Sequence, residues 1–104
     1  MNITYDNENR LLKLQMSEEI DHCMAEKIRN KADFEIQKYM PQRVVIDFDK
    51  VSFMDSAGIG MIIGRYKTAN MLGGKVEMTN VKPCIEKIFE MSGVLKIIPV
   101  VKSA

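Results

Sequence analysis

The residues best placed to do chemistry are an aspartate and a serine, Asp55 and Ser56, which precede a periodic apolar segment. Ile62, Ile63 and Tyr66 follow at helical spacing, and an Asp or Ser just before such a segment is the usual signal for a helix start. We therefore expect Ser56 at a helix N-terminus, where unpaired N–H groups carry partial positive charge. A hydroxyl at that position is well sited to accept a phosphoryl group without unfolding the helix.

The expected helix start has few side chains. The small residues after the serine are Ala57, Gly58, Gly60 and Gly64. Each glycine inside a helix costs about 1 kcal/mol relative to alanine, so their number indicates a purpose, such as letting another backbone approach Ser56. The alternative is that Asp55 and Ser56 only cap the helix and that the glycines let it pack tightly on a sheet. From local features alone, this second interpretation describes the commoner arrangement.

A strand, a turn and a helix must position the serine. Residues 44–46 form an apolar run without alternation, which is typical of a strand covered on both faces. Gly73 and Gly74 end the helix, and the residues after them alternate between apolar and polar types. We therefore predict a βαβ unit with parallel strands, made of strand 44–48, helix 57–71 and strand 75–79.

Further elements complete an α/β fold. Residues 2–6 and 10–16 are predicted to form a hairpin, and a loop at 17–21 leads to a helix capped by Asp21. Residues 83–93 favour another helix, and residues 97–101 are predicted to form the last strand. The predicted fold is a single domain over residues 1–104, with a mixed sheet, parallel core strands and about three to four packed helices.

Composition argues against several functional classes. The chain has 104 residues, with 15 Lys and Arg against 14 Asp and Glu, and a formal net charge of +1. This scattered, balanced charge gives no electrostatic case for direct binding of nucleic acid. No apolar stretch reaches the roughly 18 residues that a membrane helix needs, and the N-terminus does not resemble a signal peptide. We expect a cytoplasmic protein that does not contact membranes and is a monomer when free.

The residues give little support for enzymatic or cofactor chemistry. Cys23, Cys84 and the single histidine, His22, have no metal-ligand spacing, so we expect free thiols, no metal and no cofactor. A serine nucleophile with His22 as its base is disfavoured because the nucleophile-elbow pentapeptide is absent. Nucleotide binding is also disfavoured, because the phosphate-binding loop motif is missing and the glycines at 58 and 60 would lie inside a helix. We therefore expect no catalytic residue.

One stretch carries a specific family resemblance. SFMDSAGIGMIIGRYK at residues 52–67 resembles the STAS-domain anti-anti-sigma factors. The likeness continues through Gly73-Gly74, Pro83, IFEMSG at 88–93 and KII at 96–98, and so covers nearly the whole chain. GRYK at 64–67 and MSGVLKII at 91–98 favour the sporulation branch, the antagonists of the anti-sigma F factor. A general stress-response antagonist is the alternative within the same class.

The resemblance implies a phosphorylation switch. In this family an anti-sigma factor that is itself a serine kinase phosphorylates the serine matching Ser56, and a PP2C-type phosphatase removes the phosphate. The unphosphorylated protein binds the kinase and so releases the sporulation sigma factor. Many members carry a second hydroxyl residue where this chain has Ala57, and the aspartate matching Asp21 lies near the phosphorylated serine. The partner-binding residues are then expected to be Asp21, Asp55, Ser56, Ala57, Gly58, Gly60 and Met61.

Overall fold

The chain begins with the predicted β-hairpin. In the computed structural model, which describes residues 1–102, β1 (Asn2–Asp6) and β2 (Leu11–Gln15) pair antiparallel. The Asp6 carboxylate accepts hydrogen bonds from the N–H groups of Glu8 and Asn9 at 3.1 and 3.3 Å. A side-chain carboxylate that holds its own turn in this way is a common device for reversing the chain.

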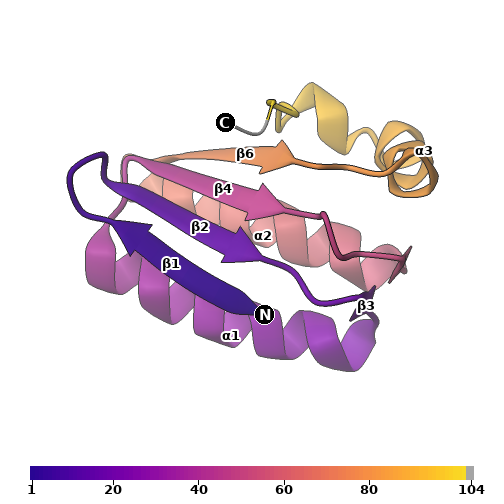
Figure 1. Cartoon of the computed structure of the whole chain (residues 1–104), viewed down its shortest axis with the longest axis horizontal. Helices are drawn as coiled ribbons and strands as arrows, with labels where there is room; N and C mark the ends of the chain where they lie inside the picture. Colours follow the sequence, from indigo (N-terminus) through magenta and orange to yellow (C-terminus); the bar gives the residue numbers. More distant parts are fainter. Residues whose placement is uncertain (103–104) are drawn as a thin grey trace.

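Four strands form the main sheet, in the order β1-β2-β4-β6 (Figure 1). β4 (Arg43–Asp47) lies between β2 and β6 (Lys75–Thr79) and is parallel to both. The sheet is therefore mixed, with an antiparallel edge strand beside a parallel core. The predicted βαβ unit is confirmed, because α2 (Ser56–Met71) connects the parallel strands β4 and β6.

Two helices cover one face of this sheet. α1 (His22–Tyr39) and α2 lie side by side against it (Figure 1). α1 turns a stripe of four residues inward, namely Ala25, Ile28, Ala32 and Ile36. The sheet residues that face the helices are Leu12, Leu14, Val44, Ile46, Val76 and Met78, each at most 3% exposed. Removing this apolar surface from water, at about 25 cal/mol per Å², is the main force holding the layers together.

A second, very small sheet lies beyond the ends of the main strands. β3 (Glu19–Ile20) and β5 (Phe53–Met54) pair in parallel. The prediction of a plain loop at 17–21 is therefore wrong, because this segment contains a strand. Two residues are too few to show an alternating pattern, so no local signal predicts this strand. β3 leads into α1 and β5 leads into α2, so their pairing brings the two helix starts together.

The last helix forms as predicted. α3 (Pro83–Ser92) has proline in its first turn and ends at Gly93, whose φ of 80° lies in the left-handed region. The helix packs onto the end of the sheet through Phe89, whose ring meets Phe48 edge-on at 5.3 Å between centroids. Both rings are fully buried. The described residues thus contain three α-helices, the lower of the two expected numbers.

The prediction of a strand at 97–101 is wrong. A 3₁₀ turn, η1 (Val94–Lys96), precedes this segment, and its pairing with β6 is a single bridge between Met78 and Val100. Two hydrogen bonds join it to Met78: the Met78 N–H donates to the Pro99 carbonyl at 2.9 Å, and the Val101 N–H donates to the Met78 carbonyl at 2.7 Å. Pro99 has no N–H to donate, which limits how far the pairing can extend.

Candidate functional site

Ser56 occupies the first position of α2, and its side chain is exposed. The preceding residue, Asp55, is the N-cap, and its Oδ1 accepts a hydrogen bond from the Ala57 N–H at 2.9 Å. The expected helix start at this pair is therefore confirmed, with the capping role falling to Asp55. An aspartate cap satisfies the helix end without using the serine hydroxyl.

The pairing of β3 with β5 sets the neighbourhood of this serine. Asp21 and Asp55 each follow a residue of the paired positions Ile20 and Met54, and the Asp55 N–H donates to the Ile20 carbonyl at 3.3 Å. Asp21 caps α1, as predicted, by accepting the Met24 N–H at 2.8 Å. Two helix starts, each capped by an aspartate, therefore lie at the same edge of the molecule as the exposed hydroxyl.

Gly58 is required for packing beneath the helix start. A Cβ at this position would lie 2.7 Å from the Met54 sulfur and 3.3 Å from Cγ2 of Ile20. The absence of a side chain lets α2 rest directly on the small sheet. Gly58 is buried, and tight packing explains why this position carries a glycine.

Gly60 and Gly64 are different. A Cβ at either position would meet no atom within 4 Å. Neither glycine is therefore needed for packing inside the described part of the chain. Gly60 is exposed, and it is one of the residues expected to face a partner.

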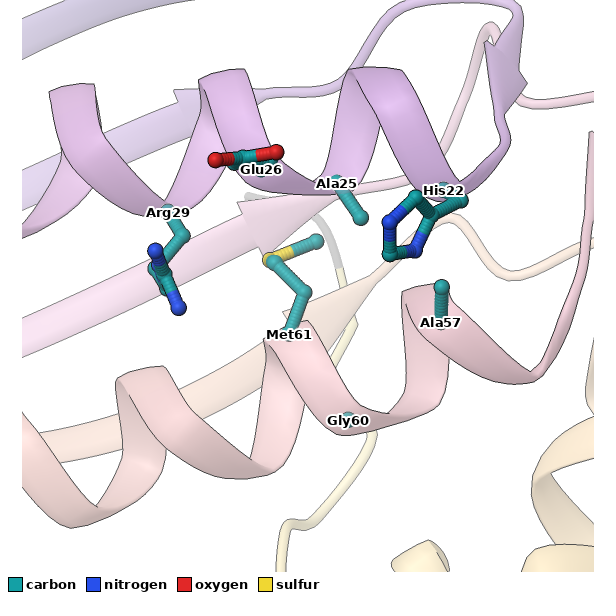
Figure 2. A pocket seen from close by; sticks show the side chains of 7 residues that line it. All are labelled: His22, Ala25, Glu26, Arg29, Ala57, Gly60 and Met61. Carbon is teal, nitrogen blue, oxygen red and sulfur yellow. The ribbon is translucent and has the colours of Figure 1, made fainter.

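An open cavity of about 490 Å³ lies between the N-terminal halves of the two helices (Figure 2). It is lined from α1 by His22, Ala25, Glu26 and Arg29, and from α2 by Ala57, Gly60 and Met61. We call it the α1–α2 groove. Met61 is only 5% exposed and its side chain points between the helices, so it forms the floor of the groove. Three of the predicted partner-binding residues thus share this groove, and its α1 wall was not foreseen.

A buried ion pair fixes the two helices relative to each other. Arg65 of α2 is 4% exposed, and its Nε lies 2.8 Å from Oδ1 of Asp33 in α1. The contact is an ion pair without the alignment of a good hydrogen bond. Burial lowers the pKa of the Arg65 guanidinium, and the charge of Arg29 lowers it further, while Asp33 opposes both effects. The sequence shows this arginine within GRYK but gives no sign of its partner.

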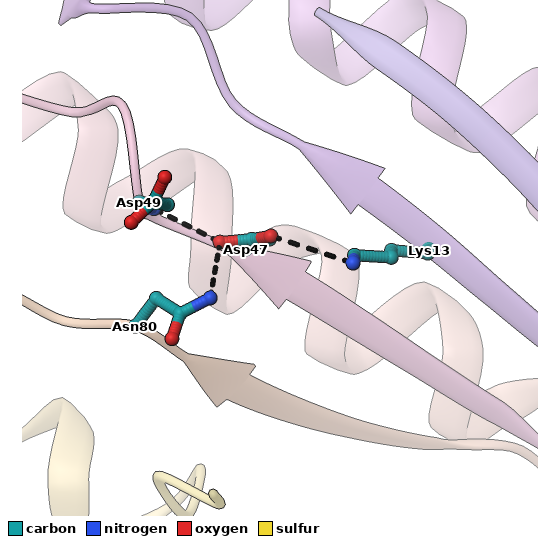
Figure 3. A network of polar contacts seen from close by, with 4 residues as sticks. All are labelled: Lys13, Asp47, Asp49 and Asn80. Atoms are coloured by element: carbon teal, nitrogen blue, oxygen red, sulfur yellow. Dashed lines mark hydrogen bonds and ion pairs between the residues drawn. The ribbon is translucent and has the colours of Figure 1, made fainter. Parts of the chain in front are cut away.

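A second polar network supports the loop that carries the serine (Figure 3). Asp47, at the end of β4, is 2% exposed. Its Oδ1 accepts hydrogen bonds from the Asp49 N–H at 2.9 Å and from Nδ2 of Asn80 at 3.1 Å. Its Oδ2 lies 3.5 Å from Nζ of Lys13. These contacts tie the start of the segment between β4 and β5 to β2 and to the residue after β6.

A metal-binding cluster and a membrane-spanning helix are both absent from residues 1–102. Within residues 1–102, no group of three or more His, Cys, Asp and Glu side chains could hold a metal ion. Cys23 and Cys84 are free and exposed. No helix in this part of the chain has the length and apolar character needed to cross a bilayer.

The mixed sheet, the two helices on one of its faces and the serine exposed where the second helix begins agree with the STAS fold. The family model described as STAS domain matches residues 2–104, and the chain belongs to this family. The chain is 33% identical over 100 residues to the anti-sigma F factor antagonist of Paenibacillus polymyxa, covering 96% of this chain and 86% of that protein. It is 29% identical over 103 residues to the anti-sigma-B factor antagonist of Bacillus subtilis (strain 168), covering 96% and 92%.

A solved structure supports the same placement. The anti-sigma factor antagonist SpoIIAA in its unphosphorylated form superimposes with a TM-score of 0.81 at 25% sequence identity. The match covers 99% of this chain and 89% of that chain. The expected fold class is therefore confirmed over the described residues.

Proposed function

We propose that this chain is an anti-sigma factor antagonist whose activity is switched off by phosphorylation of Ser56. The observation that carries the proposal is the exposed Ser56 hydroxyl at the start of α2, left free by the Asp55 cap. The similarity to an anti-sigma F factor antagonist over 96% of the chain supports it. Two other hydroxyls on the helices are engaged: Thr68 donates to the Gly64 carbonyl at 3.0 Å, and Ser92 donates to the Phe89 carbonyl at 2.9 Å.

In the unphosphorylated state, the surface around Ser56 binds an anti-sigma factor that is also a serine kinase. Binding displaces the sporulation sigma factor from that kinase. Asp55 holds the loop and orients the hydroxyl, and Gly58 lets the helix start sit low on the small sheet. The kinase holds the ATP and supplies the catalytic base, so this chain acts as a ligand and substrate. We propose that it does so in the cytoplasm and as a monomer.

Phosphorylation acts on the interface. A phosphoserine adds about −1.5 to −2 charges, which a helix N-terminus accommodates. The same charge, placed beside the carboxylates of Asp21 and Asp55, cannot be buried against a partner without matching cations. Like-charge contact and lost hydration at an interface cost several kcal/mol, so the kinase is released. A PP2C-type phosphatase restores the binding form.

The proposal is tested by mixing the protein with candidate anti-sigma kinases and ATP, beginning with the anti-sigma F factor of P. polymyxa. Phosphopeptide mapping by mass spectrometry is expected to place the phosphate on Ser56. Ser56→Ala is expected to bind the kinase and resist phosphorylation, whereas Ser56→Asp is expected to bind poorly. Phosphate on Thr68 or Ser92, with Ser56 unmodified, would refute the assignment.

A general stress-response antagonist is the second candidate, favoured by the 29% identity to the anti-sigma-B factor antagonist. The two candidates differ in which anti-sigma factor is captured. A competition assay with both anti-sigma factors, each loaded with its own sigma factor, separates them. Release of the sporulation sigma factor alone supports the first candidate, and release of sigma-B alone supports the second.

A further inference from the structure

The α1–α2 groove continues the surface around Ser56 onto a second helix. Ala57, the residue after the serine, lines the groove, and His22 faces it from the start of α1 (Figure 2). A protein that places an active site over the Ser56 hydroxyl must therefore also cover the mouth of this groove. On the proposed function, which is taken as the basis here, the protein that covers Ser56 is the anti-sigma kinase.

Among residues 1–102, no packing contact requires a glycine at position 60. A Cβ there would meet nothing within 4 Å, although glycine is less favourable than alanine inside a helix. Gly58, two positions earlier, is fully explained by Met54 and Ile20. Gly60 also lines the groove, so its bare backbone faces the open space. The free protein gains nothing from this glycine, which points to a partner that packs closely against it.

The lining of the groove indicates what it accepts. Ala25 and Met61 give it an apolar floor, and Met61 is itself almost fully buried. Glu26 and Arg29 stand one turn apart on the α1 wall and carry opposite charges. A phosphate group would meet Glu26 as well as Arg29, so an anion is poorly matched. An apolar side chain with polar groups beside it suits a floor and rim of this kind.

We propose that the anti-sigma kinase inserts an apolar side chain into the α1–α2 groove and packs its backbone against Gly60. The partner surface then includes Glu26 and Arg29 of α1 together with the surroundings of Ser56. α1 and α2 are clamped by the ion pair between Arg65 and Asp33, so the groove is preformed in the free protein. A preformed groove spares the complex the entropy of ordering it.

The first test fills the groove. Gly60→Ala and Gly60→Leu are compared with Gly64→Ala, a matched control whose added Cβ also meets nothing within 4 Å but which does not line the groove. Affinity for the anti-sigma F factor of P. polymyxa is measured by calorimetry, with circular dichroism as the check of folding. We expect Gly60→Ala to weaken binding about 10-fold, as an overpacked contact does, and Gly60→Leu to weaken it more. Gly64→Ala is expected to bind within about twofold of the unchanged protein.

The second test reverses a charge on the α1 wall. Arg29→Glu is compared with Lys31→Glu, which makes the same charge change at an exposed position of α1 outside the groove. Only Arg29→Glu is expected to weaken binding by more than about fivefold, because it removes the cation from the groove wall and places a second acid beside Glu26 there. The inference would be overturned if both Gly60 variants and Arg29→Glu bound the kinase and were phosphorylated on Ser56 as the unchanged protein is. The proposed function would then remain intact. An unmodified Ser56 in the unchanged protein would refute the proposed function first.

Discussion

Ser56 and Asp55 have separate roles: Asp55 caps the helix, and the Ser56 hydroxyl stays exposed. A serine that capped the helix itself would spend its hydroxyl on a backbone N–H, and a phosphate there would break the cap. Here the Asp55 carboxylate makes the cap at 2.9 Å from the Ala57 nitrogen. The adjacent hydroxyl is left free, and the proposed phosphorylation would leave the Asp55 cap in place.

Two glycines of the same helix are expected to respond oppositely to a methyl group. Gly58→Ala forces a Cβ into the Met54 side chain, and overpacking of this kind costs about 1–3 kcal/mol. Gly60→Ala enters open space and improves helix propensity by up to about 1 kcal/mol. Urea unfolding of both variants measures the two changes in free energy. Destabilisation by Gly60→Ala, or none by Gly58→Ala, would show that the packing under α2 is not as described.

Local residue roles were largely predictable, and long-range ones were not. Capping by Asp21 and Asp55 follows from residue type and a following periodic segment, which are local signals. The partners of Asp47, in contrast, come from β2 and from the segment after β6. A single sequence carries no sign of such a network, because its members meet only when the sheet forms.

At the scale of elements, the predicted helices and four of the predicted strands formed, the strand predicted at 97–101 did not, and the two-residue strands were missed. β3 and β5 are held by backbone pairing at the edge of the helix starts. The segment at 97–101 has the apolar residues of a strand, but Ile98 is fully buried and Pro99 interrupts the donors, so one bridge remains. The two-residue strands and the segment at 97–101 both depend on packing against distant residues, which no local sequence pattern shows.

α1 and α2 are joined by a charge pair in which Arg65 is buried, so removing Asp33 alone is expected to be worse than removing both partners. Asp33→Asn leaves the Arg65 guanidinium buried without a counter-charge, and we expect a loss of about 3 kcal/mol. Arg65→Met keeps the methylene packing and leaves only Asp33, which is 30% exposed, so a loss of about 1 kcal/mol is expected.

A double-mutant cycle by urea denaturation measures the coupling between Asp33 and Arg65. The combined variant, Asp33→Asn with Arg65→Met, is expected to be more stable than Asp33→Asn alone, because no unpaired buried charge remains. Glu35→Gln, a charge-neutralising change elsewhere on α1, serves as the control. Simple additivity of the two single changes would mean that the pair does not couple the helices.

For the whole molecule, the site lies at the margin of the fold, while the core lies between the main sheet and the helices. The core reaches the helix starts through Ile20 and Met54, but Ser56 itself is exposed and lies outside the core. A charge added at Ser56 therefore changes the surface and leaves the packing as it is. This separation favours a switch that works by admitting or repelling a partner over one that works by refolding.

The phosphomimetic Ser56→Asp tests this separation directly. Its free energy of unfolding is expected to stay within about 1 kcal/mol of the unchanged protein, because a negative charge at a helix N-terminus gains about 0.3–1 kcal/mol and nearby carboxylates oppose it. Its affinity for the kinase is expected to fall at least about 100-fold, and higher salt is expected to recover part of that loss by screening. Urea unfolding and calorimetry at two salt concentrations measure both quantities, with Ser56→Ala as the uncharged control. A large loss of stability in Ser56→Asp that Ser56→Ala does not share would instead indicate a switch acting through the fold.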